Sequence, residues 1–257
     1  MNCPHTGQAL REILGGRAFQ NEQGVIYVKG TRSLDYGADY FLTEYEKQYG
    51  KTYLQDEPNL RRLAARRLED LSRVAPPPAS LFEIGAACGF FLDEARICGY
   101  DVHGLEISEF ASNHARSLGL DVQTASFPTA TNKQYDVVAA FFVLEHFPDQ
   151  KSAFESVSKM IRPGGIFAAA LPSSHGPTLK YSPDDWIRTH PEDHFADYSP
   201  RSLAKILPLY GMELINARPA SFHPSRARGI LRWPPLYRLY ARANSFGDTM
   251  EILARKK

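Results

Sequence analysis

The sequence predicts an α/β fold with a mostly parallel sheet and helices on both faces. From residue 80 onward, short apolar runs alternate with segments of helical periodicity. A turn of small residues, Gly85–Gly89, joins the first apolar run to its helix, and the next run ends in Glu106, 21 positions after Gly85. A strand, a tight turn, a helix and an acid at the tip of the next strand are typical of a nucleotide-binding βαβ unit.

Length and composition set the outer limits. With 257 residues the chain can bury one α/β core with appendages. Its 30 Lys and Arg residues nearly balance 29 Asp and Glu residues, so the charge gives no reason to expect nucleic acid or an anionic membrane as a partner. We find no apolar run of the roughly 20 residues that span a bilayer, no apolar signal core and no repeated cysteine spacing. We therefore expect a cytoplasmic protein without a membrane span.

Residues 1–55 are predicted to form an N-terminal flap or lid. Cys3–Gly7 resembles the start of a zinc ribbon, but Cys3 has no paired cysteine, so we expect no zinc there. Residues 17–20 and 25–29 flank a polar turn and predict a hairpin, either a decayed ribbon or a simple flap.

Four aromatic side chains then lie about one helical turn apart: Tyr40, Phe41, Tyr45 and Tyr49. This spacing predicts a helix that packs on the core, or a lid whose tyrosines reach a bound ligand, and both interpretations stay open.

Residues 56–257 are predicted to form the main domain. A helix over residues 56–74 begins at Asp56, an N-cap residue, and its arginines favour a solvated face over a phosphate site. The core elements that follow are strand 81–84, helix 90–98, strand 101–106, helix 108–118, strand 120–124, strand 135–143, helix 149–161, turn 162–165 and strand 166–171.

Two stretches of this domain carry a family resemblance. The stretch Glu83–Gly89 reads EIGAACG and resembles the first motif of class I S-adenosylmethionine-dependent methyltransferases, E/D-x-G-x-G-x-G, with Ala87 in place of the middle glycine. The run from YDVV through LEHF to IRPGGIF, residues 135–167, resembles their fourth motif and the strand after it. The resemblance covers about residues 81–171 and implies a Rossmann-like sheet of seven strands with the last one antiparallel.

The resemblance also implies a cofactor, S-adenosyl-L-methionine, with S-adenosyl-L-homocysteine as product. Glu106 would accept hydrogen bonds from the ribose diol, and Gly85 and Gly89 would let the methionine part approach the backbone. Ser126 stands where an acid is common in the family, although Phe127 can still stack on adenine. The complete set of expected cofactor contacts is Glu83, Gly85, Ala86, Cys88, Gly89, Glu106, Ile107, Phe127, Phe142 and Tyr40.

Glu145 and His146 follow the predicted fourth strand. Some family members bind a divalent ion with E-x-x-E-H, but Phe142 stands at the first acid here, and a single Glu–His pair is a poor magnesium site. We therefore expect no metal. Glu145 is predicted to cap or pin the loop, while His146 shapes the pocket wall or acts as a base.

Residues 173–197 are polar and rich in proline, and are predicted to form a long loop at the ligand-binding edge of the sheet. The sequence HPEDHFADYSPRSL resembles a segment before a late helix in small-molecule methyltransferases. We take His194 as the first candidate base in this loop and His190 as the second, and His146 as a further candidate. The alternative is that His194 only holds the loop in place.

The C-terminal part is predicted to hold a helix over residues 200–210 and two strands over residues 212–217 and 249–254. Between the strands lies an insertion over about residues 218–247, where arginines alternate with aromatics. With almost no net charge, this pattern favours a flap over the substrate or a homodimer contact over nucleic acid binding.

Taken together, we expect methyl transfer to an O, N or C nucleophile of a small molecule, with a sugar or a secondary metabolite favoured. The chain lacks the D/N-P-P-Y/F signature of adenine or amide methylation and a Pro-Cys nucleophile. An NAD-type oxidoreductase is disfavoured by the missing G-x-G-x-x-G. The other alternative is a non-catalytic cofactor-binding or interaction module on the same fold.

Overall fold

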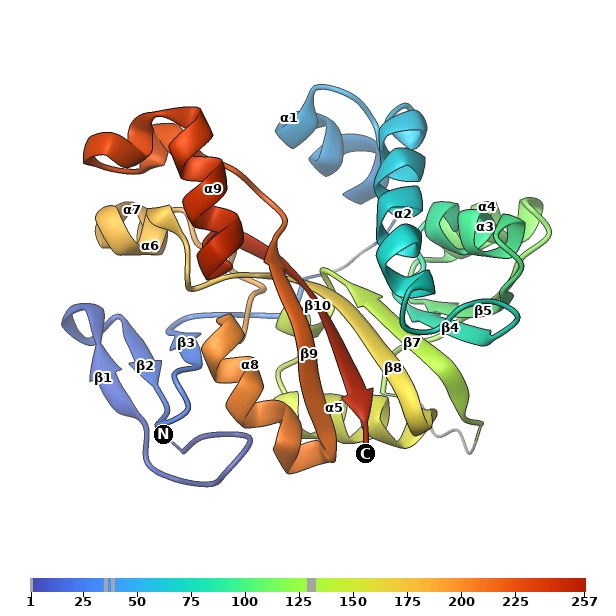
Figure 1. The fold of residues 1–257 in the computed structure, drawn as a ribbon, viewed down its shortest axis with the longest axis horizontal. Helices are drawn as coiled ribbons and strands as arrows, with labels where there is room; N and C mark the ends of the chain where they lie inside the picture. The colour runs from blue at the N-terminus through green and yellow to red at the C-terminus, as the bar shows by residue number, and fades with distance from the viewer. Residues whose placement is uncertain (1, 35–36, 38–39, 129–132) are drawn as a thin grey trace. The chain divides into compact units, whose positions relative to one another are not determined.

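The computed structural model describes residues 2–34, 37, 40–128 and 133–257, with residues 40, 44, 48 and 49 described by their backbone alone. Its strands form a seven-stranded sheet in the order β6-β5-β4-β7-β8-β10-β9 and a separate three-stranded sheet, β1-β2-β3. Figure 1 shows β9 and β10 side by side, and their pairing is antiparallel. The predicted α/β fold with seven strands is therefore confirmed. The chain divides into two compact units, and each is described by itself.

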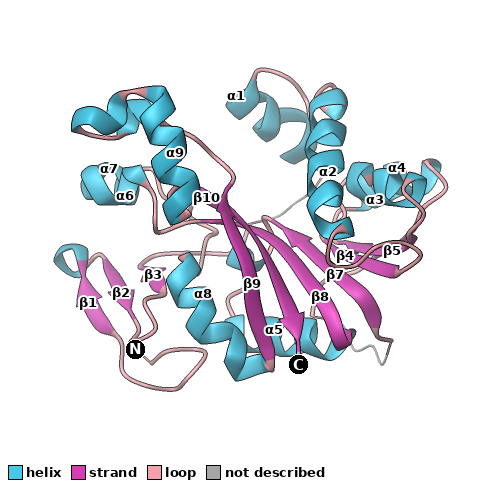
Figure 2. Cartoon of the chain, in the orientation of Figure 1, coloured by secondary structure: helices cyan, strands magenta, loops and turns pink. Residues whose placement is uncertain are grey.

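The first unit comprises residues 34–140 and 159–168. Its elements are a π-helix (Tyr40–Glu44), α1 (Tyr45–Tyr49), α2 (Glu57–Ser72), β4 (Ser80–Ile84), α3 (Phe90–Ile97), β5 (Asp101–Glu106), α4 (Glu109–Ser117), β6 (Asp121–Thr124) and β7 (Tyr135–Phe141). Strand β4 pairs in parallel with β5 and β7, and β5 pairs in parallel with β6, which is the predicted βαβ order (Figure 2). We call this part the cofactor unit.

Packing glycines let the helices of the cofactor unit lie close to its strands. A Cβ atom at Gly104 in β5 would stand 2.7 Å from a methyl group of Leu92 in α3. Because real Cβ atoms do not approach so closely, only glycine fits at this contact. The start of β4 is fixed by Asp136 in β7, whose carboxylate accepts hydrogen bonds from the amide and hydroxyl of Ser80 at 2.8 and 2.7 Å.

The aromatic segment packs on the core of the same unit. Phe41 is 3% exposed and belongs to one cluster with Cys88, Phe90 and Ala111. Asp56 begins α2 as predicted, yet its carboxylate does not cap the helix. It accepts instead from the hydroxyl of Tyr45 at 2.8 Å and pairs with Lys51 at 2.6 Å. The arrangement supports core packing for Phe41, while the side chains of Tyr40 and Tyr49 lie outside the described residues.

The second unit comprises residues 2–33, 141–158 and 169–257 of the described chain. Its main elements are β1 (Arg11–Ile13), β2 (Ala18–Gln20), β3 (Ile26–Val28), a short 3-10 helix (Leu144–His146), α5 (Gln150–Met160), the last four residues of β8 (Ile161–Pro172), α6 (Pro177–Tyr181), α7 (Pro183–Arg188), α8 (Pro200–Ile206), β9 (Met212–Pro219), α9 (Pro234–Asn244) and β10 (Thr249–Lys256). We call this part the histidine unit, after the cluster described below.

The N-terminal segment is fastened to the rest of the histidine unit. The predicted hairpin is confirmed by the antiparallel pairing of β2 with β3, and β1 extends it. The ring of buried His5 hydrogen-bonds the hydroxyls of Tyr210 and Tyr198 at 2.7 and 2.8 Å. The sulfur of Cys3 accepts from the side-chain amide of Asn21 at 3.1 Å. These hydrogen bonds engage Cys3 and His5, which lie in the segment that resembled the start of a zinc ribbon.

Three boundaries differ from the sequence predictions. The segment over residues 173–197 is not irregular throughout, because it contains the short helices α6 and α7, each with proline in its first turn, where a missing N–H is harmless. Strand β8 begins at Ile161, so the residues predicted as a turn, 162–165, belong to the strand. Strand β7 ends at Phe141, since Phe142 has a φ of 57° and turns the chain.

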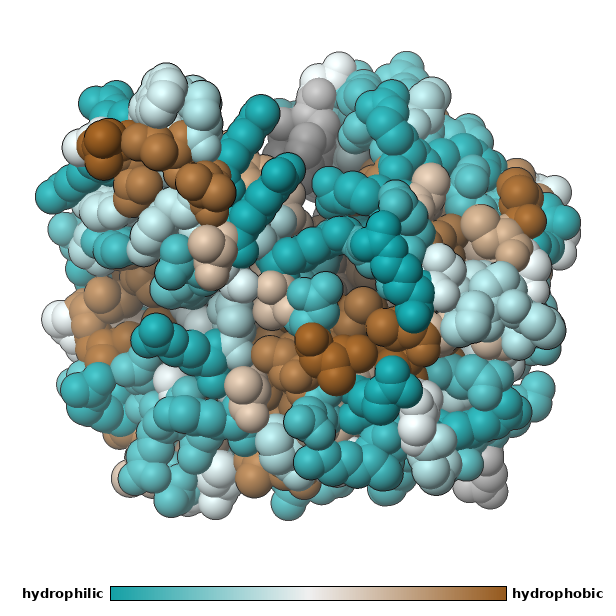
Figure 3. All heavy atoms as spheres, in the orientation of Figure 1, coloured by the Kyte–Doolittle hydropathy of each residue, from teal (hydrophilic) through white to brown (hydrophobic). Residues whose placement is uncertain are grey.

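The insertion after β9 is helical and leaves hydrophobic side chains on the surface. Helix α9 buries Tyr237 and Ala241 against Phe246. Ile230 and Leu239 are 74% and 68% exposed, and Figure 3 shows hydrophobic surface over this region. Its interpretation as a flap or a homodimer contact stays a prediction. Among the described residues, no helix is both long and apolar enough to cross a membrane.

Candidate functional site

The turn between β4 and α3 holds its backbone in the left-handed region at three alternate positions. The φ angles are 72° at Gly85, 47° at Ala87 and 86° at Gly89. These are the three glycine positions of the motif that the sequence resembles, so the structure explains their spacing. Ala87 adopts a conformation that costs an L-residue roughly 1–2 kcal/mol relative to glycine.

Glu106, at the tip of β5, closes this turn. Its carboxylate is buried and accepts hydrogen bonds from the amides of Ala87 and Ser108, each at 2.8 Å. Burial raises the pKa of Glu106, and the backbone hydrogen bonds oppose that shift. A carboxylate has about four acceptor positions, so the two that remain can take the hydroxyls of a ribose diol. The side chain is thus held by the turn in a fixed orientation.

The other predicted cofactor contacts in this unit include both buried and exposed side chains. The side chains of Ala86 and Cys88 are buried, which leaves their backbone as the part that could meet a ligand. Ile107 is 56% exposed and offers an apolar surface next to Glu106. Buried Glu83 has one carboxylate oxygen without a hydrogen-bond partner among the described residues. Burial raises the pKa of Glu83 well above its ordinary value. The charge of Arg67 opposes this shift, and the charge of Glu106 adds to it.

Gly89 also has a packing role. A Cβ atom there would lie 2.7 Å from a methyl group of Leu120 and 2.8 Å from the Cβ of Ala115. Glycine at this position therefore lets α4 and the following loop pack against the turn, and its contact with the methionine part stays a prediction. Phe127 lies beyond β6, and the side chain of Tyr40 is outside the described residues.

The histidine unit contains a second group of polar residues, which we call the histidine cluster: Glu145, His146, His190, Asp193, His194 and Asp197. The rings of His146 and His194 meet edge to face with centroids 4.9 Å apart, and those of His194 and His190 lie 5.7 Å apart. Nδ1 of His146 bonds the carboxylate of Asp193 at 3.1 Å, and Nε2 of His190 bonds that of Asp197 at 2.7 Å.

Backbone contacts bring these residues together from distant parts of the chain. The turn at Phe142 leads into the 3-10 helix Leu144–His146, and the carbonyl of Glu145 accepts from the amide of Phe195 at 2.7 Å. Ile26 in β3 pairs with Asp197, through N···O distances of 2.8 and 3.0 Å. The N-terminal hairpin thus fixes the loop that carries two of the histidines. Phe142 itself is 39% exposed.

The environments of the two predicted bases push their pKa values apart. Burial disfavours the charged ring of His146, but the hydrogen bond to Asp193 and the negative charges of Glu145 and Asp193 outweigh it and raise the pKa. Burial and then the neighbouring His146 lower the pKa of His194 to about 3. At neutral pH, His194 is therefore uncharged, and His146 is the better proton acceptor.

Glu145 is the least satisfied polar residue of the cluster. It is 0% exposed, and neither carboxylate oxygen has a hydrogen-bond partner among the described residues. Burial raises its pKa to about 7. Glu145 holds the loop through its backbone carbonyl, which accepts from the amide of Phe195, and not through its side chain. An unpaired buried carboxylate is costly, so this position favours a bound proton or a ligand.

The cluster also contains two sets of potential metal ligands that share His194. Ligand atoms of Glu145, His146 and His194 lie within 4.8 Å of one another, as do those of His190, His194 and Asp197. The sequence indicated only Glu145 and His146 as potential ligands here, and the structure adds His194 as a third. Sequence reasoning missed Asp193 and Asp197 as partners of the histidines, since nothing in their local pattern shows that residues 146 and 193 meet.

A search of family models matches residues 57–217 to a methyltransferase domain. A ubiquinone biosynthesis O-methyltransferase from Bordetella avium is 26% identical over 201 residues, which cover 68% of this chain and 75% of the relative. One of the same name from Methylobacterium is 30% identical over 118 residues, 42% of this chain and 47% of the relative.

Solved structures share the fold. A SAM-dependent methyltransferase from Thermotoga maritima superimposes with a TM-score of 0.58 at 17% identity, covering 85% of this chain and 98% of its own. Magnesium protoporphyrin IX methyltransferase from Synechocystis, solved with bound SAH, gives a TM-score of 0.57 at 14% identity, covering 85% and 97%. At such identities the likeness concerns the fold alone.

Proposed function

The chain belongs to the class I S-adenosylmethionine-dependent methyltransferases, and from this premise we propose that it methylates a hydroxyl oxygen of a small molecule. The observation that carries the proposal is the pairing of His146 with Asp193 beside an unpaired buried acid, Glu145. A histidine held by a carboxylate in this way can accept the proton that a hydroxyl loses on methylation. The similar proteins from Bordetella avium and Methylobacterium, both named ubiquinone biosynthesis O-methyltransferases, support oxygen as the acceptor atom.

The cofactor unit fits S-adenosylmethionine, which supplies an activated methyl group on its sulfonium sulfur when bound. Glu106 would hold the ribose diol with its remaining acceptor positions. Ile107 and Phe127 would pack on the adenine, and Gly85 would allow close approach of the backbone. The orphaned oxygen of Glu83 fits a hydrogen bond to the ammonium of the methionine part. These residues bind and orient, and none of them exchanges a proton.

The histidine cluster would handle the acceptor. The proton that the acceptor hydroxyl loses would pass to Nε2 of His146, because Nδ1 already bonds Asp193. Asp193 fixes the tautomer and stabilises the charged ring. His194 would position the acceptor as an uncharged ring. Hydrogen bonding thus favours His146 as the base over His194, which the sequence placed first.

The proposal is tested by ligand binding and by a label. We expect S-adenosylhomocysteine, but not NAD, to raise the melting temperature of the purified chain. We also expect radioactive methyl groups to pass from S-adenosylmethionine to hydroxyl-bearing small molecules in an acceptor panel. A melting shift with NAD alone would contradict the family function. Methyl transfer confined to amines would leave the family intact and contradict the oxygen assignment.

A further inference from the structure

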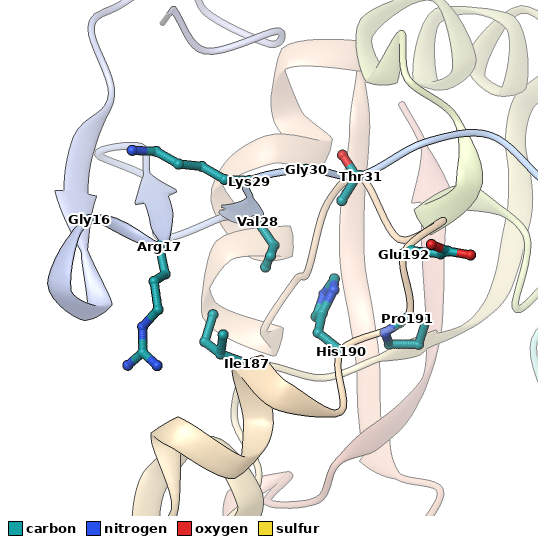
Figure 4. A pocket seen from close by; sticks show the side chains of 10 residues that line it. All are labelled: Gly16, Arg17, Val28, Lys29, Gly30, Thr31, Ile187, His190, Pro191 and Glu192. Atoms are coloured by element: carbon teal, nitrogen blue, oxygen red, sulfur yellow. The ribbon is translucent and has the colours of Figure 1, made fainter.

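The histidine unit contains a pocket of about 360 Å³ between its N-terminal hairpin and the segment after α7. Figure 4 shows the ring of His190 projecting into the space between Val28 and Pro191. Ligand pockets commonly measure about 300–1,000 Å³, so this one suits a single substituted ring better than a long chain. Of the histidine cluster, only His190 lines this pocket, and two ring contacts connect it to the proposed base: from His190 to His194, with centroids 5.7 Å apart, and from His194 to His146, with centroids 4.9 Å apart.

The two edges of the pocket differ in charge. Arg17 and Lys29 extend from the hairpin, and Glu192 lies on the other side of His190 from them (Figure 4). The charge of Glu192 is compensated, because Arg32 donates two hydrogen bonds to its carboxylate at 2.8 and 3.0 Å. The edge with Arg17 and Lys29 is therefore cationic. At the other edge, Glu192 has its charge balanced by Arg32 but can still accept hydrogen bonds.

The cations at the first edge can exchange their partners. Arg17 pairs with Asp184 at 2.5 Å and also donates from Nε to the carbonyl of Leu14 at 2.9 Å. Lys29 pairs with Glu12 at 3.2 Å and lies over the ring of Phe19. The two acids are 84% and 62% exposed and are not part of the pocket wall. Exposed ion pairs of this kind contribute little to stability, so an anionic group of a ligand can replace either acid at little cost. Arginine, with its planar fork, suits a phosphate or carboxylate particularly well.

The rest of the wall suits hydroxyl groups on a compact ring. The side chain of His190 is 4% exposed, and Nε2 is engaged by Asp197. Its Nδ1 has no hydrogen-bond partner among the residues that the structure describes, and is thus available to a ligand hydroxyl, as is the hydroxyl of Thr31. Val28, Ile187 and Pro191 provide apolar contacts. Sugars combine such features, because their hydroxyl groups lie at the ring edge and their C–H groups form an apolar face.

We propose that this pocket binds an anionic sugar, either a sugar phosphate or a uronic acid, as the methyl acceptor. The anionic group lies against Arg17 and Lys29, and ring hydroxyls bond His190, Thr31 and Glu192. The inference rests on the proposed function, since it names the substrate class of the same enzyme. Sugar phosphate and uronic acid share the chemistry that the pocket recognises, and the experiment separates them.

The test is isothermal titration of the full chain with three probes: glucose 6-phosphate, glucuronate and uncharged glucose. Titrations without cofactor measure the pocket alone, and a parallel titration with S-adenosylhomocysteine measures the cofactor unit. We expect at least one anionic sugar to bind about tenfold or more tightly than glucose, since each tenfold step requires only about 1.4 kcal/mol. The anion that binds more tightly identifies the subclass.

Two variants with equal change in charge locate the site. Arg17→Gln should weaken binding of the anionic sugar by about fivefold or more, as loss of a charge-assisted hydrogen bond predicts. Arg11→Gln is the matched control, because Arg11 lies in β1 of the same small sheet and bonds Gln20 outside the pocket. The affinity of this variant for the anionic sugar should stay at the wild-type value.

Three results would overturn the inference: no binding of either anion at tens of millimolar, equal affinity for glucose, or equal weakening by both arginine variants. Binding of S-adenosylhomocysteine in the same protein distinguishes the cases. If it binds and the sugars do not, only the pocket assignment is wrong. If sugars bind and it does not, the methyltransferase proposal fails separately.

Discussion

Glu106, the last residue of β5 in the cofactor unit, and Glu145 of the histidine unit, which follows β7, are both buried acids, but their surroundings differ. The carboxylate of Glu106 accepts two backbone amides at 2.8 Å. That of Glu145 has no hydrogen-bond partner among the described residues and lies beside His146. Fixed backbone donors hold the first acid in one orientation, whereas the second acid depends on neighbours that can gain or lose protons.

This difference in hydrogen bonding suits Glu106 to ligand binding and Glu145 to proton transfer. A carboxylate held by backbone donors suits recognition of a ribose, because the donors fix the direction of its free acceptor positions. A carboxylate with a pKa of about 7 beside a histidine of raised pKa changes charge in the range where enzymes operate. We therefore expect changes at the first acid to alter cofactor affinity, and changes around the second to alter turnover.

The largest expected effect is at His146. His146→Ala should lower single-turnover methyl transfer by about 100-fold or more, because removing a general base has that cost. His194→Ala should cost less, since a ring with a pKa of about 3 is a weak base. Cofactor affinity, measured by titration calorimetry, should stay at the wild-type value in both. Losses under about fivefold in both variants would remove histidine base catalysis and leave positioning of the reactants.

The next effect concerns Glu106. Glu106→Ala should weaken binding of S-adenosylhomocysteine by about 1.5–3 kcal/mol, the contribution of hydrogen bonds to a charged group. Glu109→Ala is the control, because Glu109 is an acid in the first turn of α4 and is exposed. Circular dichroism must first show that the Glu106 variant is folded, since this side chain also holds the turn. An unchanged dissociation constant in a folded variant would contradict the ribose assignment.

A third prediction concerns pH. The base must be neutral, and Asp193 and Glu145 raise the pKa of His146 above its ordinary value of 6.5, so turnover should increase with pH through a midpoint above that value. Asp193→Asn removes one negative charge and should move the midpoint to lower pH. Because Glu145, His146 and His194 interact, the midpoint belongs to the group. A midpoint that Asp193→Asn leaves in place would exclude His146 as the titrating base.

A smaller effect is expected at the cofactor turn. Ala87→Gly should raise the free energy of unfolding by no more than about 1 kcal/mol, because glycine relieves the left-handed strain but has more freedom in the unfolded chain. Gly89→Ala should destabilise the fold, since its Cβ would meet Leu120 and Ala115. Denaturant titration of both variants checks the contrast. Clear destabilisation by Ala87→Gly would show that the methyl group of Ala87 packs usefully.

We expect no effect from metal removal. The proposed mechanism places a proton on His146 without a metal, so turnover should survive EDTA and gain nothing from magnesium. The triad of Glu145, His146 and His194 makes this a demanding test, because imidazole and carboxylate ligands suit zinc and related metals. Loss of turnover on chelation that zinc restores would identify the triad as a metal site.

The sequence by itself determined most of the cofactor unit. Strand β5 has the bounds that its apolar pattern predicted, and Ser108 begins α4 with its hydroxyl accepting from Ala111. The spacing of the glycines located the turn between β4 and α3, because backbone positions with positive φ favour glycine. Each of these features depends on neighbours within about 25 positions, which a reader of the chain can see.

Only the tertiary structure decided the histidine cluster and the pocket. Asp193 reaches His146 across 47 positions, Asp197 pairs with Ile26 in the N-terminal hairpin, and the pocket lies between that hairpin and the segment after α7. The same holds for the packing role of Gly89, which is set by Leu120 and Ala115. Residue type and spacing encode local dihedral preferences and faces, but contacts between distant segments depend on how complete elements pack.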